Sequence, residues 1–134
     1  MGCWVTTGET DLAKMLATLT VLRRDEPVTM VTVTSAVHVS DGIYVALVED
    51  EGTTVVATVA EAERRGWSTD FRAAWLTIET HSSLDAVGLT AAMSRVLTEH
   101  NIACNVLAGY YHDHLLVPLD LADRAIAALE SLRG

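Results

Sequence analysis

The sequence predicts an α+β fold, an antiparallel sheet with its helices on one face. Short runs rich in β-branched residues alternate with stretches in which apolar residues recur three or four positions apart. The order of these segments is close to βαββαβ, used twice, which is a ferredoxin-like tandem repeat. No linker rich in Gly, Ser or Pro separates residues 1–70 from 71–134. We therefore expect two units that pack as one body.

The first predicted element is a short helix that Thr10 can cap. Its apolar residues recur at the spacing of one buried face: Leu12, Met15, Leu16 and Leu19. After a break at residues 23–27, residues 28–34 alternate β-branched side chains, which is typical of a strand. Because the first half begins with a helix, we expect a strand from the other half to complete its sheet.

A hairpin is predicted next. Apolar, β-branched runs at 43–48 and 53–58 flank the sequence EDEG, in which Gly52 can adopt the positive φ of a tight turn. The acidic residues of that turn are expected to be solvated.

A second short helix should follow the hairpin. Thr58 and Glu61 have the spacing of a capping box, and Gly66 is placed to end the helix. Residues 75–80 then form a run of mainly apolar and β-branched residues, which predicts a strand.

The second half repeats the alternation. Its longest helix should begin between Asp85 and Leu89 and bury one stripe of side chains: Leu89, Met93, Val96 and Leu97. Strands are predicted over 102–108 and 115–117. Asp120 is placed to cap a last helix, whose apolar residues also share a face: Leu121, Ala125, Leu129 and Leu132.

Composition excludes several functional classes. The 134 residues are half hydrophobic and carry a net charge of -9, which opposes binding to the phosphates of nucleic acids. No apolar run approaches the roughly 18 residues that span a bilayer, and the N-terminus lacks the pattern of a signal peptide. The chain has only two cysteines, Cys3 and Cys104, which form no CxxC pair. This low number favours reduced thiols. We expect a cytoplasmic protein that binds neither membranes nor nucleic acid.

Unusual polar chemistry gathers around the start of the longest helix. The first N–H groups of a helix have no partner within it and lie at the positive end of its dipole, so amides around Val87, Gly88 and Leu89 can hold a carboxylate. Gly88 lacks a Cβ, which lets a ligand approach the backbone. Preceding side chains can serve an ammonium or polar group: Ser82, Ser83 and Asp85. Alternatively, one of these side chains only caps the helix, and Gly88 allows close packing of helix on sheet.

A polar hairpin tip is predicted near the end of the sheet: Tyr110, Tyr111, His112, Asp113 and His114. Histidines two apart on a strand face the same way and can bind a metal ion, with His81 or His100 as a third donor. A His–Asp pair can instead act as a base and its orienting group. The sequence specifies no nucleophile, HExxH motif or cysteine cluster. We therefore favour a tip that hydrogen-bonds a neighbouring loop, with no cofactor and no stoichiometric zinc.

The segments HSSLDAVGLTAA and NIACNVLAGYYHDHLLVP closely resemble the C-terminal half of a family of small tandem ACT-domain proteins, which are related to the regulatory domains of aspartate kinases. The first half matches this family more weakly. The resemblance implies a sensing role for a free amino acid held where two ACT units meet. Together with the local chemistry it predicts these ligand-binding residues: His81, Ser82, Ser83, Asp85, Val87, Gly88, Leu89, Asn105, Tyr110, His112, Asp113 and His114.

Three functions remain open from the sequence. The first is a non-enzymatic, ACT-type regulatory module that binds a small amino-acid-like ligand and forms a homodimer through ACT-to-ACT packing. The second is a metal-assisted or His–Asp hydrolase at the tip formed by residues 112–114. The third is a structural dimerisation module. Ligand-dependent stabilisation would distinguish the first from the others.

Overall fold

A computed structural model describes residues 11–80 and 87–134. Contacts divide the chain into two compact units, which are described separately below. Unit 1 consists of residues Met1–Arg23 and Trp75–Gly134, and unit 2 of Arg24–Ala74. The predicted division at residues 70 and 71 follows sequence order, whereas these units group the N-terminal helix and strand with the C-terminal half.

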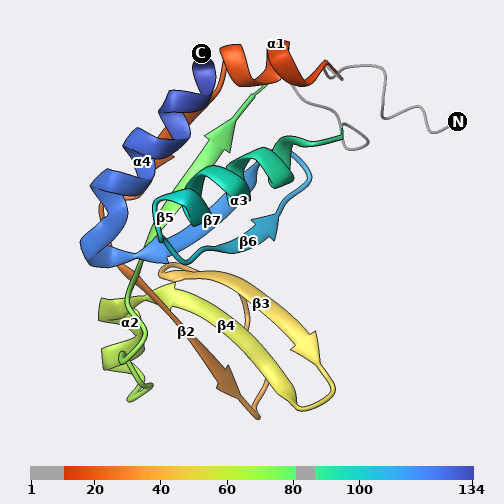
Figure 1. Ribbon diagram of the computed structural model, residues 1–134. Helices are drawn as coiled ribbons and strands as arrows, with labels where there is room; N and C mark the ends of the chain where they lie inside the picture. Colours follow the sequence, from red (N-terminus) through yellow and green to blue (C-terminus); the bar gives the residue numbers. More distant parts are fainter. Residues whose placement is uncertain (1–10, 81–86) are drawn as a thin grey trace, which may run out of the picture. The chain divides into compact units, whose positions relative to one another are not determined.

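Unit 1 holds three α-helices and four strands within its described residues (Figure 1). In chain order these are α1 (Leu12–Ala17), β1 (Thr20–Arg23), β5 (Ala73–Glu79), α3 (Leu89–Glu99), β6 (Asn105–Ala108), β7 (Asp113–Pro118) and α4 (Ala122–Glu130). Short 3-10 turns flank α4, at Leu119–Leu121 and Ser131–Arg133.

The sheet of unit 1 has the order β1-β5-β7-β6. β1 runs antiparallel to β5, with Thr20 opposite Glu79 and Arg23 opposite Leu76, and β6 runs antiparallel to β7. Helix α3 contacts α1 and α4, and α4 contacts β1 and β7. The helices of this unit therefore pack together against the sheet. The tandem ferredoxin-like arrangement of the whole chain stays a prediction.

Strand β1 was not predicted. The sequence predicted that the second half would lend a strand to the first, and Ala73 at the start of β5 does pair with Val28. In unit 1 the N-terminal strand also pairs with β5 of the second half. A hydrogen bond also connects the C-terminal segment to the segment between α1 and β1: Nε of Arg133 donates to the carbonyl of Leu19 at 2.7 Å. The four-residue strand β1 (Thr20–Arg23) is thus an edge strand of the unit 1 sheet, whose other strands all begin at Ala73 or later.

The helix ends of unit 1 correct two predictions. Asp11, not Thr10, is the N-cap of α1, and its carboxylate accepts from the N–H groups of Ala13 and Lys14. Asp120 lies in a 3-10 turn and does not cap α4, whose N-cap position is Leu121. Leu121 and Leu132 are only half-buried, so the buried stripe of α4 shares just Ala125 and Leu129 with the prediction. Its residues are Ala122, Ala125, Ala128 and Leu129.

The longest helix confirms its prediction in part. Its buried residues are the predicted Leu89, Met93, Val96 and Leu97, and its first residue is Leu89. After it, Asn101 adopts a positive φ of 57° and reverses the chain. Strand β6 consequently begins at Asn105, three residues later than predicted, while β7 begins two residues earlier, at Asp113.

Unit 2 contains the predicted hairpin and a neighbouring strand. Its elements are β2 (Val28–Val33), β3 (Ile43–Glu49), β4 (Gly52–Thr58) and α2 (Val59–Arg64). β4 pairs antiparallel with both β2 and β3, and Glu49 faces Gly52 across the turn. A Cβ on Gly52 would stand 2.8 Å from Oγ1 of Thr32, so close strand packing requires glycine here. The core of unit 2 includes Ile43, Val55 and Ala57.

Half of the predicted capping box is present at α2. Oγ1 of Thr58 accepts a 3.1 Å hydrogen bond from the N–H of Glu61. The Glu61 carboxylate does not return to Thr58 and instead pairs with Arg64 and Arg65. Gly66 follows the helix with φ of 74°, as predicted for its C-terminal end.

Candidate functional site

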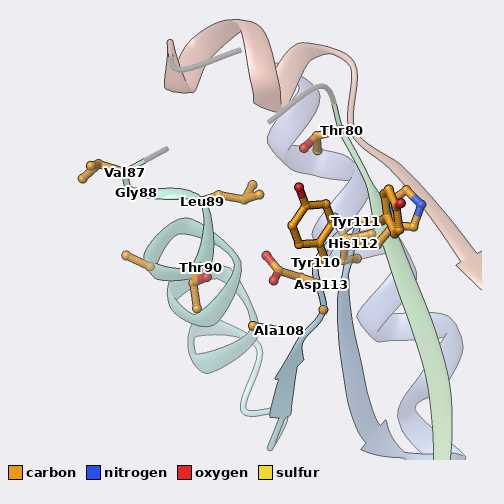
Figure 2. A pocket seen from close by; sticks show the side chains of 13 residues that line it. Thr80, Val87, Gly88, Leu89, Thr90, Ala108, Tyr110, Tyr111, His112 and Asp113 are labelled. Carbon is orange, nitrogen blue, oxygen red and sulfur yellow. The ribbon is translucent and has the colours of Figure 1, made fainter. Parts of the chain in front are cut away.

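A cleft of about 430 Å³ lies within unit 1, between the start of α3 and the hairpin that joins β6 to β7. The end of β5 supplies a third wall through Ile78 and Thr80. Figure 2 shows the Tyr110 ring and the Asp113 side chain facing the first turn of α3 across this space. The cleft lies in the volume range typical of sites for small molecules.

The N-terminus of α3 forms one side of the cleft. Gly88 is its N-cap residue, with a left-handed φ of 101° and no side chain to cap the helix. No described carbonyl or side chain accepts a hydrogen bond from the N–H groups of Leu89 and Thr90. These amides lie at the positive end of the helix dipole, where negative charge is favoured.

The missing Cβ of Gly88 leaves room for close packing. A Cβ built there would stand 3.1 Å from Cδ2 of Leu12 in helix α1. The positive φ alone also favours glycine. Of the two roles that the sequence allowed for Gly88, the structure supports close packing, although against a helix instead of the sheet.

The opposite side of the cleft is a tight hairpin tip. The N–H of Gly109 donates a 2.9 Å hydrogen bond to the carbonyl of His112, which closes the turn. Tyr110 and Tyr111 at its apex are 67% and 82% exposed, and their rings meet edge to face at 5.0 Å. A Cβ on Gly109 would stand 2.9 Å from the His112 carbonyl oxygen, so this turn needs glycine.

Asp113 is the carboxylate of the cleft. Burial raises the pKa of its side chain above the usual range, and the neighbouring charge of His114 lowers that pKa to a lesser degree. Within the described residues this carboxylate takes part in no hydrogen bond or salt bridge, and the adjacent His114 imidazole is the charged group that acts on it. Asp113 thus presents a partly desolvated acidic group to the cleft.

The two histidines of the tip have different partners. Nε2 of His112 lies 3.7 Å from Oε2 of Glu79, while its Nδ1 is buried and has no hydrogen-bond partner in the described part of the chain. Nδ1 of His114 lies 3.0 Å from Oγ1 of Thr77, which also accepts from the indole N–H of Trp75. His114 therefore belongs to a network on the sheet, whereas His112 borders the cleft.

The predicted site residues fall into three groups. Six line the cleft: Val87, Gly88, Leu89, Tyr110, His112 and Asp113. Two do not, since Asn105 is an exposed residue opposite Leu116 in the sheet and His114 contacts Thr77. The predictions for His81, Ser82, Ser83 and Asp85 fall outside the described residues, as does the proposed third metal donor His81.

Seven lining residues were not predicted: Ile78, Thr80, Thr90, Ala91, Ala108, Gly109 and Tyr111. Gly109 and Tyr111 adjoin predicted residues, so the hairpin pattern was a usable signal for them. The others come from β5, α3 and β6, and only the fold brings them together.

The described part of the chain contains no group of three or more His, Cys, Asp or Glu side chains that could hold a metal ion. His100, the other candidate third donor, lies at the C-cap of α3, where its Nδ1 is 2.8 Å from the carbonyl oxygen of Val96.

Comparison with known proteins finds two ACT-domain models that match this chain, one over residues 7–74 and the other over 70–131. A solved Vibrio cholerae structure is 33% identical, with a TM-score of 0.83 over 92% of this chain and 96% of that one. That protein is described as having unknown function and as a possible transport protein.

A second solved structure, from Agrobacterium tumefaciens, shares the fold at 14% identity, with a TM-score of 0.58 over 86% of this chain and 87% of that one. No curated protein matches. Among the helices of the described residues, none is long and apolar enough to cross a membrane.

Proposed function

Because the chain belongs to the family of tandem ACT-domain proteins, we propose that it is a non-enzymatic regulatory module that binds a small amino-acid-like ligand. The observation that carries this proposal is the cleft of about 430 Å³ between the first turn of α3 and the β6–β7 hairpin. We also propose that the protein acts in the cytoplasm.

The chemistry of the cleft suits such a ligand. The amides of Leu89 and Thr90 offer hydrogen bonds to an acid group at the positive end of α3. Thr80 and Asp113 add polar groups, and Leu89 with Ile78 adds apolar surface for a side chain. Polar groups placed beside apolar surface in this way fix the orientation of a small ligand.

A thermal-shift screen of the twenty amino acids tests the proposal. A ligand present at 100 times its Kd adds about 2.7 kcal/mol to the free energy of unfolding. For a protein of this size, that raises Tm by roughly 10 °C. No shift with any amino acid at millimolar concentration would contradict the proposal.

A pair of matched variants locates the binding. Ala91 is an exposed helix residue that lines the cleft, and Ala127 is an exposed helix residue of α4 outside it. Ala91→Leu should narrow the cleft and reduce the ligand-induced shift, whereas Ala127→Leu should keep it. Equal shifts in both variants would place the ligand elsewhere.

Pairing of two chains is the second part of the proposal. The exposed Tyr110 and Tyr111 favour it, because tyrosine is enriched at interfaces, where its large ring is buried and its hydroxyl stays hydrated. Light scattering during size-exclusion chromatography should give twice the chain mass of 14.4 kDa. Tyr111→Ser should shift this mass toward the monomer, and a dimer unaffected by this change would lie on another surface.

A further inference from the structure

Among the described residues that line the cleft, Asp113 is the only one with a carboxylate. Its side chain points into the cleft, between the Tyr110 ring and the first turn of α3 (Figure 2). Within the described residues it makes no ion pair or hydrogen bond. An acidic group that is partly removed from water and unpaired is costly to the free protein, and a bound cation would offset that cost.

Among the described residues that line the cleft, no Lys or Arg competes for this carboxylate. None of the 13 lining residues is Lys or Arg, and the only titratable imidazole among them is His112. The second charge nearby is also negative, since Glu79 lies 3.7 Å from Nε2 of His112. The carboxylate of Asp113 therefore faces no Lys or Arg among the described lining residues, which favours a cationic ligand.

Aromatic surface adjoins the carboxylate. Tyr110 lines the same cleft, its ring stands beside Asp113 in Figure 2, and 67% of its surface is exposed. The face of a tyrosine ring attracts an ammonium group within about 6 Å of its centre. A carboxylate with an aromatic neighbour is a pairing that suits an organic ammonium ion.

We propose that the cleft selects its ligand by an ammonium group, with Asp113 as the binding partner of that group and the Tyr110 ring beside it. This inference rests on the proposed function of the same cleft. It assigns the larger part of the affinity to the ammonium end of the ligand, and a smaller part to the acid end at the α3 amides.

Three matched sets of compounds test the proposal. Each set holds an amino acid, the amine that lacks its carboxylate and the acid that lacks its ammonium group. The probes are alanine, ethylamine and propionate; leucine, 3-methylbutylamine and 4-methylpentanoate; and phenylalanine, phenethylamine and 3-phenylpropionate. Titrations followed by amide NMR shifts of Gly88, Gly109 and Asp113 report binding at the cleft itself.

The expected result is that, in at least one set, the amine binds within about tenfold of the amino acid and the acid binds at least tenfold more weakly. Ionic hydrogen bonds of typical strength account for a ratio of this size. The reverse order, with the acid retained and the amine lost, would overturn the ammonium assignment while leaving the proposed function intact. Amines that bind while no amino acid does would contradict the proposed function alone.

Asp113→Asn removes the charge while nearly preserving the shape of the side chain. We expect it to weaken binding of the amine and the amino acid at least tenfold and to leave the acid unchanged or slightly stronger. Asp120→Asn, at an exposed position outside the cleft, is the matched control and should change none of the affinities. Unchanged amine affinity in folded Asp113→Asn, or binding of none of the nine compounds to the native protein, would overturn the proposal.

Discussion

The Cβ position of Gly88 lies 3.1 Å from Cδ2 of Leu12, at the point where helix α1 meets the start of α3. Gly88 also holds φ at 101°, a conformation that side chains disfavour. Glycine is therefore favoured at position 88 both by the left-handed backbone and by the close contact with Leu12, at the edge of the cleft.

Gly88→Ala should therefore destabilise the protein by about 1–3 kcal/mol. The left-handed backbone accounts for about 1–2 kcal/mol of this loss, and the contact with Leu12 for the rest. Urea unfolding measures the change in free energy.

Gly66→Ala supplies the control, since Gly66 has φ of 74° but no atom within 4 Å of its Cβ position. That variant should show the backbone cost alone. If Gly88→Ala is no worse than Gly66→Ala, and Leu12→Ala does not relieve it in the double variant, the packing argument fails.

The cap of α2 gives a second prediction. Thr58 is 3% exposed, and its hydroxyl accepts from the N–H of Glu61. Thr58→Ala should cost about 0.5–2 kcal/mol, the usual loss for an N-cap. Thr58→Ser keeps the oxygen and should recover most of the stability in urea titrations. Equal losses for Ala and Ser would mean that the Thr58 methyl group, and not the cap, stabilises this region.

Local patterns in the sequence were sufficient to predict the hairpin of unit 2 and the buried stripe of α3. In both, the side-chain period and the turn residues lie close together along the chain. The sequence could not reveal β1, because residues 20–23 become a strand only by pairing with β5, which begins at Ala73. Nor could it place Asp120, where a 3-10 turn intervenes before α4.

The residues of the candidate site also fall into two groups: those that local sequence patterns predict, and those that only the fold brings to the cleft. The polar cluster of the hairpin tip was sufficient to predict Tyr110, His112 and Asp113, whereas Thr80 and Thr90 reach the cleft only through the packing of β5 and α3. The role of Gly88 depended on its distance from Leu12, which no local pattern encodes.

Thr77 links two side chains on the sheet of unit 1. Its Oγ1 accepts a 3.1 Å hydrogen bond from the indole N–H of Trp75 and lies 3.0 Å from Nδ1 of His114. Thr77→Val keeps the shape but loses both hydrogen bonds, so the free energy of unfolding should fall by about 1–3 kcal/mol.

Thr77→Ser is the control for Thr77→Val, because it retains the hydroxyl and should lose less. The Trp75 indole proton should shift in NMR spectra of the Val variant only. A Val variant as stable as the native protein would show that these two hydrogen bonds contribute no net stability.

The last prediction concerns pH and the carboxylate of Asp113. Burial raises the pKa of Asp113 in the folded protein, so the folded state holds this proton more tightly than the unfolded state does. The contribution of Asp113 to stability is therefore fully present below its unfolded pKa and is lost as pH rises through the folded pKa.

Asp113→Asn cannot ionise, so at neutral pH it should be more stable than the native protein, and the difference should shrink as pH falls. The imidazoles of His112 and His114 lie next to this carboxylate and remain in both proteins, which lets the difference isolate Asp113. Urea midpoints measured from pH 7 down to about pH 4 test this, with Asp120→Asn as the control that should not reproduce the trend. A less stable Asp113→Asn at neutral pH would mean that the charged carboxylate makes a favourable interaction in the folded protein. In that case the cleft would lack the unpaired charge that favours a cationic ligand.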